Sequence, residues 1–268
     1  MVYEIMHREN CVAQISTVGE CKIYLEDFMP YDLMLEESND FDKRIKNAMS
    51  FYSWCASRMI PPDRTYAKEI LNSIGASQSV TDRERAQIAL SYHCLSLLDV
   101  FWVKEENEKI RFEDINLFAH SLSNALVDIA LRGHQMTVTN AHLLANDLST
   151  GGLYPKAWVR KEDGFYLYKD GGRDAVEREV LASKICRCFD CHQVLYEQGM
   201  FENEPVSISK IMTSQRYSLV TYAAYDVYCT NHDWNTLDKI LELDAPGYYM
   251  MNILDYLVGN TDRHWENW

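Results

Sequence analysis

The stretch YLVGNTDRHWENW at residues 256–268 carries polar side chains at unusually close spacing. Asn260, Asp262, His264 and Asn267 all lie within it, directly after an apolar segment. Phosphoryl transfer needs a carboxylate that accepts or orients the proton of the nucleophile, and a neutral oxygen ligand that helps to hold magnesium. Asp262 and Asn267 offer both groups within one short segment.

The spacing of Asp262 and Asn267 matches one kind of phosphotransferase loop. An aspartate followed five positions later by an asparagine, D-x-x-x-x-N, is the arrangement of kinase catalytic loops. In such a loop Asn260 and His264 would be supporting groups that fix its conformation. A solvated loop can also hold these residues by chance, so the interpretation depends on what precedes the stretch.

The chain upstream of this stretch alternates between strand and helix patterns. KAWVRKEDGFYLYKDGG at residues 156–172 reads as two alternating runs around a turn, which predicts a β-hairpin. A helix is expected at about 173–190, followed by strands in HQVLYEQ and PVSISKIM. Three helices follow, in YSLVTYAAYDVYC, TLDKILEL and GYYMMNILDYLVG. The order predicts a small sheet lobe at 140–212 and then a helical lobe at 213–268.

Lys169, on the second strand of the hairpin, is the first candidate for a residue that binds an anion. It alternates with Phe165 and Leu167, so it should share a face with partly buried apolar residues. A lysine there is costly unless its ammonium meets an anion. Glu179 on the following helix is the expected partner, whereas Glu177 lies on the opposite side of that helix. The alternative is a lysine at the end of a strand that reaches solvent.

The segment LSTGGLYPK at residues 148–156 precedes the hairpin. Gly151 and Gly152 allow a tight turn with exposed backbone N–H groups, which is how loops cradle phosphates. An ordinary turn is the competing interpretation, because a pair of glycines is a common turn signal.

Residues 1–139 predict a separate domain that is mainly helical. Short strands are expected in residues 1–38, and helices in 41–60, 61–75, 81–102 and 112–133. Thr81 should cap the third of these helices, because Glu84 completes a capping-box spacing.

Taken together, these stretches resemble the HipA-like protein kinases, the branch typified by bacterial toxin kinases of toxin–antitoxin pairs. LSTGGLYPKAWV resembles the phosphate loop of that family, GFYLYKDGG with EREVLASKI its lysine strand and glutamate helix, and LVGNTDRHWENW its catalytic loop. The catalytic-loop core is also similar to that of phosphatidylinositol and actin–fragmin kinases. The resemblance implies an α+β, protein-kinase-like bilobal fold whose helical lobe is incomplete.

The resemblance also implies roles for individual residues, with ATP and Mg²⁺ as cofactors. Ser149 would be the serine that the family autophosphorylates, and Lys169, oriented by Glu179, would contact the α- and β-phosphates. Asp262 would be the catalytic base, His264 would support it, and Asn267 would bind the metal. The remaining nucleotide-binding positions are in the phosphate loop and along the adenine: Thr150, Gly151, Gly152, Lys156, Ser209, Ile211 and Met212. The expected acceptor is Ser or Thr of a protein, with an antitoxin-like or regulatory protein as a further partner.

Composition excludes some partners. The net charge of −14 argues against a direct nucleic-acid or anionic-membrane surface, because phosphate backbones demand excess Lys and Arg. No apolar run is long enough to span a membrane, and the first residues lack a signal-peptide pattern. We therefore expect a cytoplasmic protein with reduced thiols. In CRCFDCH, Cys188, Cys191 and His192 match a haem-attachment spacing or part of a zinc site, but small thiols packed on a helix is the favoured interpretation.

Kinases of this kind need another metal-binding aspartate beyond the loop asparagine. None follows Asn267 within the 268 residues, so we expect either a fragment of a longer product or a truncated chain of low activity. The alternative function is a pseudokinase or nucleotide-binding interaction module whose N-terminal domain grips a partner. A helical interaction protein without nucleotide is a third possibility.

Overall fold

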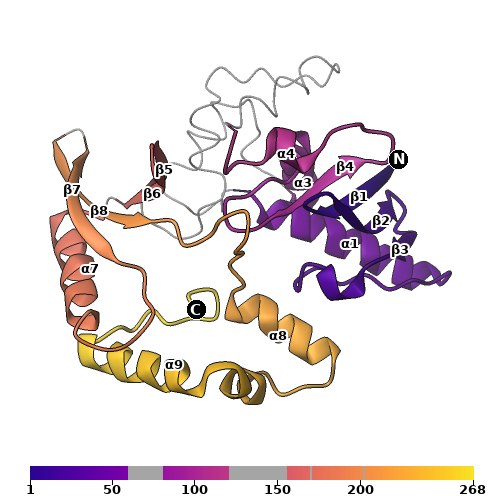
Figure 1. Cartoon of the computed structure of the whole chain (residues 1–268). Helices are drawn as coiled ribbons and strands as arrows, with labels where there is room; N and C mark the ends of the chain where they lie inside the picture. The colour runs from indigo at the N-terminus through magenta and orange to yellow at the C-terminus, as the bar shows by residue number, and fades with distance from the viewer. Residues whose placement is uncertain (60–80, 121–155, 170, 202) are drawn as a thin grey trace. The chain divides into compact units, whose positions relative to one another are not determined.

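The computed structural model describes residues 1–59, 81–120, 156–169, 171–201 and 203–268. This part of the chain is a mixed α+β protein with two antiparallel four-stranded sheets (Figure 1). The chain divides into two compact units. The first comprises Met1–Trp158 with Thr213–Ser218, and the second comprises Val159–Met212 with Leu219–Trp268.

The first unit is built around a sheet with the strand order β3-β2-β1-β4. Its strands are β1 (Val2–His7), β2 (Asn10–Ser16), β3 (Cys21–Ile23) and β4 (Phe101–Glu105). Strands β1 and β2 form a tight hairpin in which His7 pairs with Asn10, and β4 adds to the other edge of β1. Ile5, Val12 and Ile15 are fully buried, so this sheet forms the core of the unit.

The helices of the first unit begin where their capping residues predict. Helix α1 (Phe41–Ser57) starts after Asp40, whose side chain accepts a hydrogen bond from the Lys43 backbone N–H. Helix α3 (Asp82–Ser91) starts at the capping box that was predicted for Thr81 and Glu84, and that prediction is confirmed. The two helices pack on each other. A 3₁₀ turn, η1 (Glu26–Phe28), and a one-turn helix, α4 (Phe112–Ile115), complete the described elements of the unit.

The prediction of a mainly helical N-terminal domain is wrong, because a four-stranded sheet forms the core of this unit. The short strands expected within residues 1–38 are confirmed as β1, β2 and β3. The helix expected to reach residue 102 ends at Ser91, since His93 (φ 59°) and Cys94 (φ 53°) adopt left-handed backbone conformations that stop it. The chain then enters β4, which pairs with β1. Of the helix expected over 112–133, the described part forms only α4, which ends at Ile115, and residues 121–133 lie outside the described residues. The predicted helix at 61–75 lies outside the described residues.

A buried ion pair joins α1 to β4 in the first unit. The Arg58 side chain is 7% exposed, and its Nη1 and Nη2 donate to the two Asp99 carboxylate oxygens over 2.9 and 2.7 Å. Its Nε and Nη2 also donate to the backbone carbonyls of Cys94 (2.5 Å) and Phe101 (3.1 Å). The guanidinium lies 4.8 Å from the ring centroid of Trp54. Arg58 therefore ties the end of α1 to the segment that leads into β4.

The second unit holds the other sheet, with the order β5-β6-β8-β7. Its strands are β5 (Lys156–Lys161, which enters this unit at Val159), β6 (Gly164–Lys169), β7 (Tyr196–Phe201) and β8 (Glu204–Lys210). The predicted hairpin of β5 and β6 is confirmed. Helix α7 (Arg173–Cys186) follows β6 and packs against β7 and β8. Burial of Val176 and Val180 accounts for this packing, whereas Leu181 is exposed.

Two further helices follow the sheet in the second unit. Helix α8 (Tyr222–Asn231) is capped by the Thr221 hydroxyl, and α9 (Thr236–Val258) packs against both α8 and α7. Asp244 interrupts α9 with a non-helical backbone (φ −157°, ψ 72°) two residues before Pro246. This break separates the two helices that the sequence predicted there. In the described ranges, no helix is both long and apolar enough to cross a membrane.

Candidate functional site

Lys169 and Glu179 form an ion pair between the end of β6 and the middle of α7. The ammonium Nζ donates to Glu179 Oε1 over 2.9 Å, so the predicted contact is confirmed. The Lys169 side chain is only 24% exposed. The competing residue, Glu177, instead accepts from Arg173 Nε over 3.0 Å on the exposed part of the helix. The pair places one cation between strand and helix.

Two residues that sequence reasoning missed complete this cluster. The Tyr196 hydroxyl, at the start of β7, accepts from Lys169 Nζ over 3.1 Å. The Ser207 hydroxyl, on β8, donates to Glu179 Oε2. Ser207 lies directly opposite Lys169 in the β6–β8 register. A small polar residue on a buried strand was the available signal for Ser207, but no local pattern identified Tyr196.

The pKa of the Lys169 ammonium reflects two opposing effects. Burial lowers it, because desolvation disfavours the charged form, but the interactions with Tyr196 and Glu179 outweigh burial. The net result is a pKa above the ordinary value for lysine. The ammonium is therefore charged at neutral pH and held by two neighbours.

The turn at 259–268 is anchored by Asp255, another residue that the sequence analysis did not single out. Gly259, in the left-handed region at φ 67°, ends α9. The Asp255 carboxylate then accepts from Asn260 Nδ2 over 2.8 Å and from Arg263 Nε and Nη2 over 2.7 Å each. The hydrogen bond from Arg263 is the main reason that the pKa of Asp255 lies below its ordinary value.

The same turn brings together the two predicted catalytic-loop residues. Asn267 Nδ2 donates to the Asp262 backbone oxygen over 2.7 Å and to its Oδ2 over 3.2 Å. Asn260 Oδ1 accepts from the Asp262 N–H over 3.1 Å, so Asn260 contacts the backbone of this turn. His264 Nε2 lies 3.9 Å from Asp262 Oδ1. The Asp262 side chain is 84% exposed, so its carboxylate is accessible to an acceptor group.

Helix α8 holds the end of this turn in place. The Tyr222 and Ala223 N–H groups donate to the carbonyls of Trp268 (2.5 Å) and Trp265 (2.9 Å). The rings of Tyr222 and Trp268 stack with their centroids 4.4 Å apart. The first amides of a helix have no partner within it, so the turn satisfies donors that α8 would otherwise leave open.

The residues predicted to contact adenine lie at the end of β8. Ser209 is buried between its partners Leu167 on β6 and Tyr196 on β7. The Ile211 N–H donates to the Phe165 carbonyl over 2.9 Å, which extends the sheet by one residue and occupies that donor. The Met212 side chain is exposed. An adenine contact at Ile211 would therefore have to use a group other than its amide.

The predicted phosphate loop cannot be placed. Ser149, Thr150, Gly151 and Gly152 lie outside the described residues, and of Lys156 only the backbone, at the start of β5, is described.

The interpretation of CRCFDCH as thiols packed on a helix is wrong for its second half. Helix α7 ends at Cys186, so Cys188 and Cys191 follow it, and Cys188 is exposed. Among the residues that the structure places, no group of three or more His, Cys, Asp or Glu side chains could hold a metal ion.

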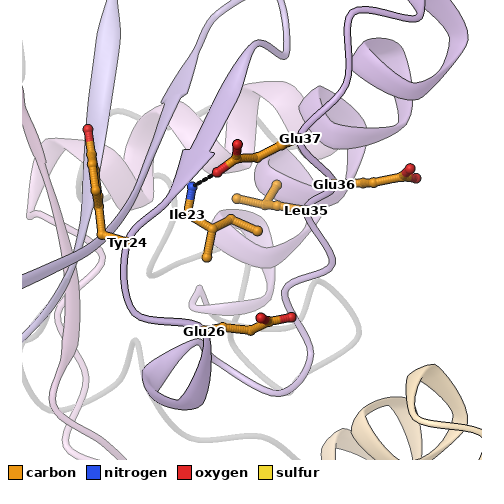
Figure 2. A pocket seen from close by; sticks show the side chains of 6 residues that line it. All are labelled: Ile23, Tyr24, Glu26, Leu35, Glu36 and Glu37. Carbon is orange, nitrogen blue, oxygen red and sulfur yellow. Dashed lines mark hydrogen bonds between the residues drawn. The ribbon is translucent and has the colours of Figure 1, made fainter.

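A pocket of about 410 Å³ lies in the first unit, and none of the predicted site residues lines it (Figure 2). Its lining is acidic and apolar: Ile23, Tyr24, Glu26, Leu35, Glu36 and Glu37. Two of its carboxylates are already engaged, because Glu37 accepts from the Ile23 N–H over 2.7 Å and Glu36 pairs with Lys43. The pocket therefore does not compete with the Lys169 cluster as a site for an anionic ligand.

No protein-family model matches the chain, and a search of curated proteins finds no match. The functional assignment therefore depends on the geometry of the second unit.

Proposed function

We propose that the chain is an ATP- and Mg²⁺-dependent phosphotransferase with a protein-kinase-like fold, acting on Ser or Thr of a protein. In this proposal β5–β8 with α7 form the small lobe, and α8 and α9 begin the helical lobe. The observation that carries it is the 2.9 Å contact between Lys169 on β6 and Glu179 on α7. The HipA-like kinases are the family that the motifs resemble.

The Lys169–Glu179 pair supports nucleotide binding through its electrostatics. In protein kinases a strand lysine binds the α- and β-phosphates, and a glutamate on the next helix orients it. Here Lys169 lies on strand β6 and Glu179 on the next helix, α7. The Lys169 ammonium stays charged although most of its side chain is buried. A cation that is already partly desolvated binds phosphate more strongly than a fully solvated lysine does.

The turn at 259–268 supports the transfer step. Asp262 would accept the proton of the acceptor hydroxyl, and its exposed carboxylate suits that task. Asn267 is held by its amide nitrogen, and its side-chain oxygen is the type of ligand that Mg²⁺ takes. The magnesium ion would neutralise charge that develops on the phosphates. Asp255 and Arg263 keep the turn in shape.

The proposal predicts that the Asp262→Asn variant separates transfer from binding. We expect phosphoryl transfer to a protein acceptor to fall by about a hundred- to ten-thousand-fold, because the base is lost. The affinity for ATP–Mg²⁺ should stay within about twofold, since binding uses Lys169 and the metal. Transfer is measured with radiolabelled ATP, and affinity by calorimetry. Asp238→Asn, an exposed aspartate at the start of α9, is the matched control.

Two outcomes of this experiment would change the proposal. Transfer that survives in Asp262→Asn would contradict the role of Asp262. ATP–Mg²⁺ binding without transfer by the unaltered chain would fit either the low activity expected from the sequence or the alternative, a nucleotide-binding interaction module whose first unit binds a regulatory partner.

A further inference from the structure

Tyr196 is held in place more firmly than its position at the end of a strand would suggest. Its backbone N–H donates to the hydroxyl of Ser183, a buried residue of α7, over 3.0 Å. On its other side it pairs with Ser209 of β8. The strand start is therefore fixed to both the helix and the sheet, and its phenol meets Lys169 from a defined direction.

The contact with Tyr196 uses one of the hydrogen-bond donors of the Lys169 ammonium. A lysine ammonium has three N–H donors and no acceptor. Glu179 takes one donor and the Tyr196 hydroxyl takes a second, while the Tyr196 ring centroid lies 4.8 Å from Nζ. No other residue that the structure describes takes the third donor. The Ser207 hydroxyl occupies the other Glu179 oxygen, so the glutamate is held as well.

A single partner would leave the ammonium poorly oriented. Lysine ends in a compact charge on a flexible four-carbon stem, so one ion pair allows it to swing about the carboxylate. Two partners on different elements, α7 and β7, restrict that swing and direct the remaining N–H. A preorganised donor binds a ligand more tightly, because less freedom is lost on binding.

We propose that Tyr196 is a positioning residue for the nucleotide, holding the Lys169 ammonium so that its third N–H is directed at the phosphates. This inference rests on the proposed function. Tyr196 acts through Lys169.

The first test needs no nucleotide. The charged and titratable groups that face Lys169 among the described residues are Glu179 from α7 and Tyr196 from β7. Tyr196→Phe keeps the ring and removes one hydrogen bond to the charged form, so the pKa of Lys169 should fall. The measurement is the pH profile of Lys169 acylation by an amine-reactive ester, read by mass spectrometry. An unchanged profile would overturn the inference.

Tyr168→Phe is the matched control. Tyr168 is adjacent to Lys169 on β6, so its side chain lies on the opposite face of the sheet. It should leave the Lys169 profile unchanged. A shift of equal size in both variants would mean that general loosening of the sheet, and not the Tyr196 hydroxyl, is responsible.

The second test is the affinity for ATP–Mg²⁺ by calorimetry. Tyr196→Phe should weaken binding about tenfold, and Tyr168→Phe by less than about twofold. Equal melting temperatures of the two variants would show that both are folded. If the unaltered chain binds ATP–Mg²⁺ but Tyr196→Phe binds equally well, the positioning role alone is wrong. If the unaltered chain does not bind, the proposed function fails and the inference with it.

Discussion

Replacing Lys169 with methionine should weaken the binding of ATP–Mg²⁺ about 100-fold, which corresponds to about 2.7 kcal/mol. Methionine keeps much of the apolar stem but removes the ammonium that the phosphates need. The loss should be large because this cation is mostly buried and is oriented by Glu179 and Tyr196. Isothermal titration calorimetry at one fixed salt concentration measures it, since screening changes the affinity of any charged ligand.

Lys210→Met is the matched control for the Lys169 variant. Lys210 lies on β8 three residues after Ser207, so it points to the opposite face of the sheet. Its ammonium contacts the Asp163 carboxylate over 2.8 Å. This variant should keep its affinity within about twofold. Equal losses of ATP–Mg²⁺ affinity in the two variants would show that binding depends on surface positive charge in general. That result would contradict a specific site at Lys169.

Replacing Arg58 with alanine should destabilise the first unit by about 3–5 kcal/mol. The change removes a two-pronged ion pair with Asp99, two hydrogen bonds to backbone carbonyls and a contact with Trp54. Asp32 lies nearby and is also affected. Burial raises its pKa and Arg58 lowers it, so the variant would leave two carboxylates in a site of low polarity. Urea denaturation followed by circular dichroism measures the free energy of unfolding.

Two further variants separate the causes of this loss. Arg111→Ala removes an exposed arginine of the same unit, which pairs with Asp114 over 3.0 Å, and should change the stability much less. Arg58→Met combined with Asp99→Leu should be more stable than Arg58→Ala, because it does not leave Asp99 buried without its cation. A loss below about 1 kcal/mol for Arg58→Ala would contradict the structural role of the buried pair.

The parts of the fold that the sequence predicted correctly are those set by local patterns. Strand alternation placed Lys169, and helical spacing distinguished Glu179 from Glu177, so the contact between strand and helix could be predicted. The capping box at Thr81 and Glu84 is equally local, since both residues belong to one turn.

The parts that could not be predicted depend on residues far apart in the chain. Tyr196 and Ser207 meet the pair only because β8 lies between β6 and β7, an order that no segment reveals by itself. Strand β4 was missed because the apolar run before it reads as a continuing helix. His93 and Cys94 break that helix with left-handed backbone, but neither is glycine, the residue whose presence would most clearly mark such a position. Asp255 was missed because its partner Arg263 lies across the Gly259 turn.

The central claim is that the Lys169 ammonium binds the phosphates of a nucleotide. The most direct measurement uses an ATP analogue whose terminal phosphate carries a reactive acyl group, which transfers to a lysine lying beside the phosphates. Mass spectrometry then identifies the labelled residue. We predict that Lys169 is labelled and that excess ATP–Mg²⁺ protects it. Label spread over exposed lysines such as Lys210, with no protection by ATP–Mg²⁺, would contradict the claim.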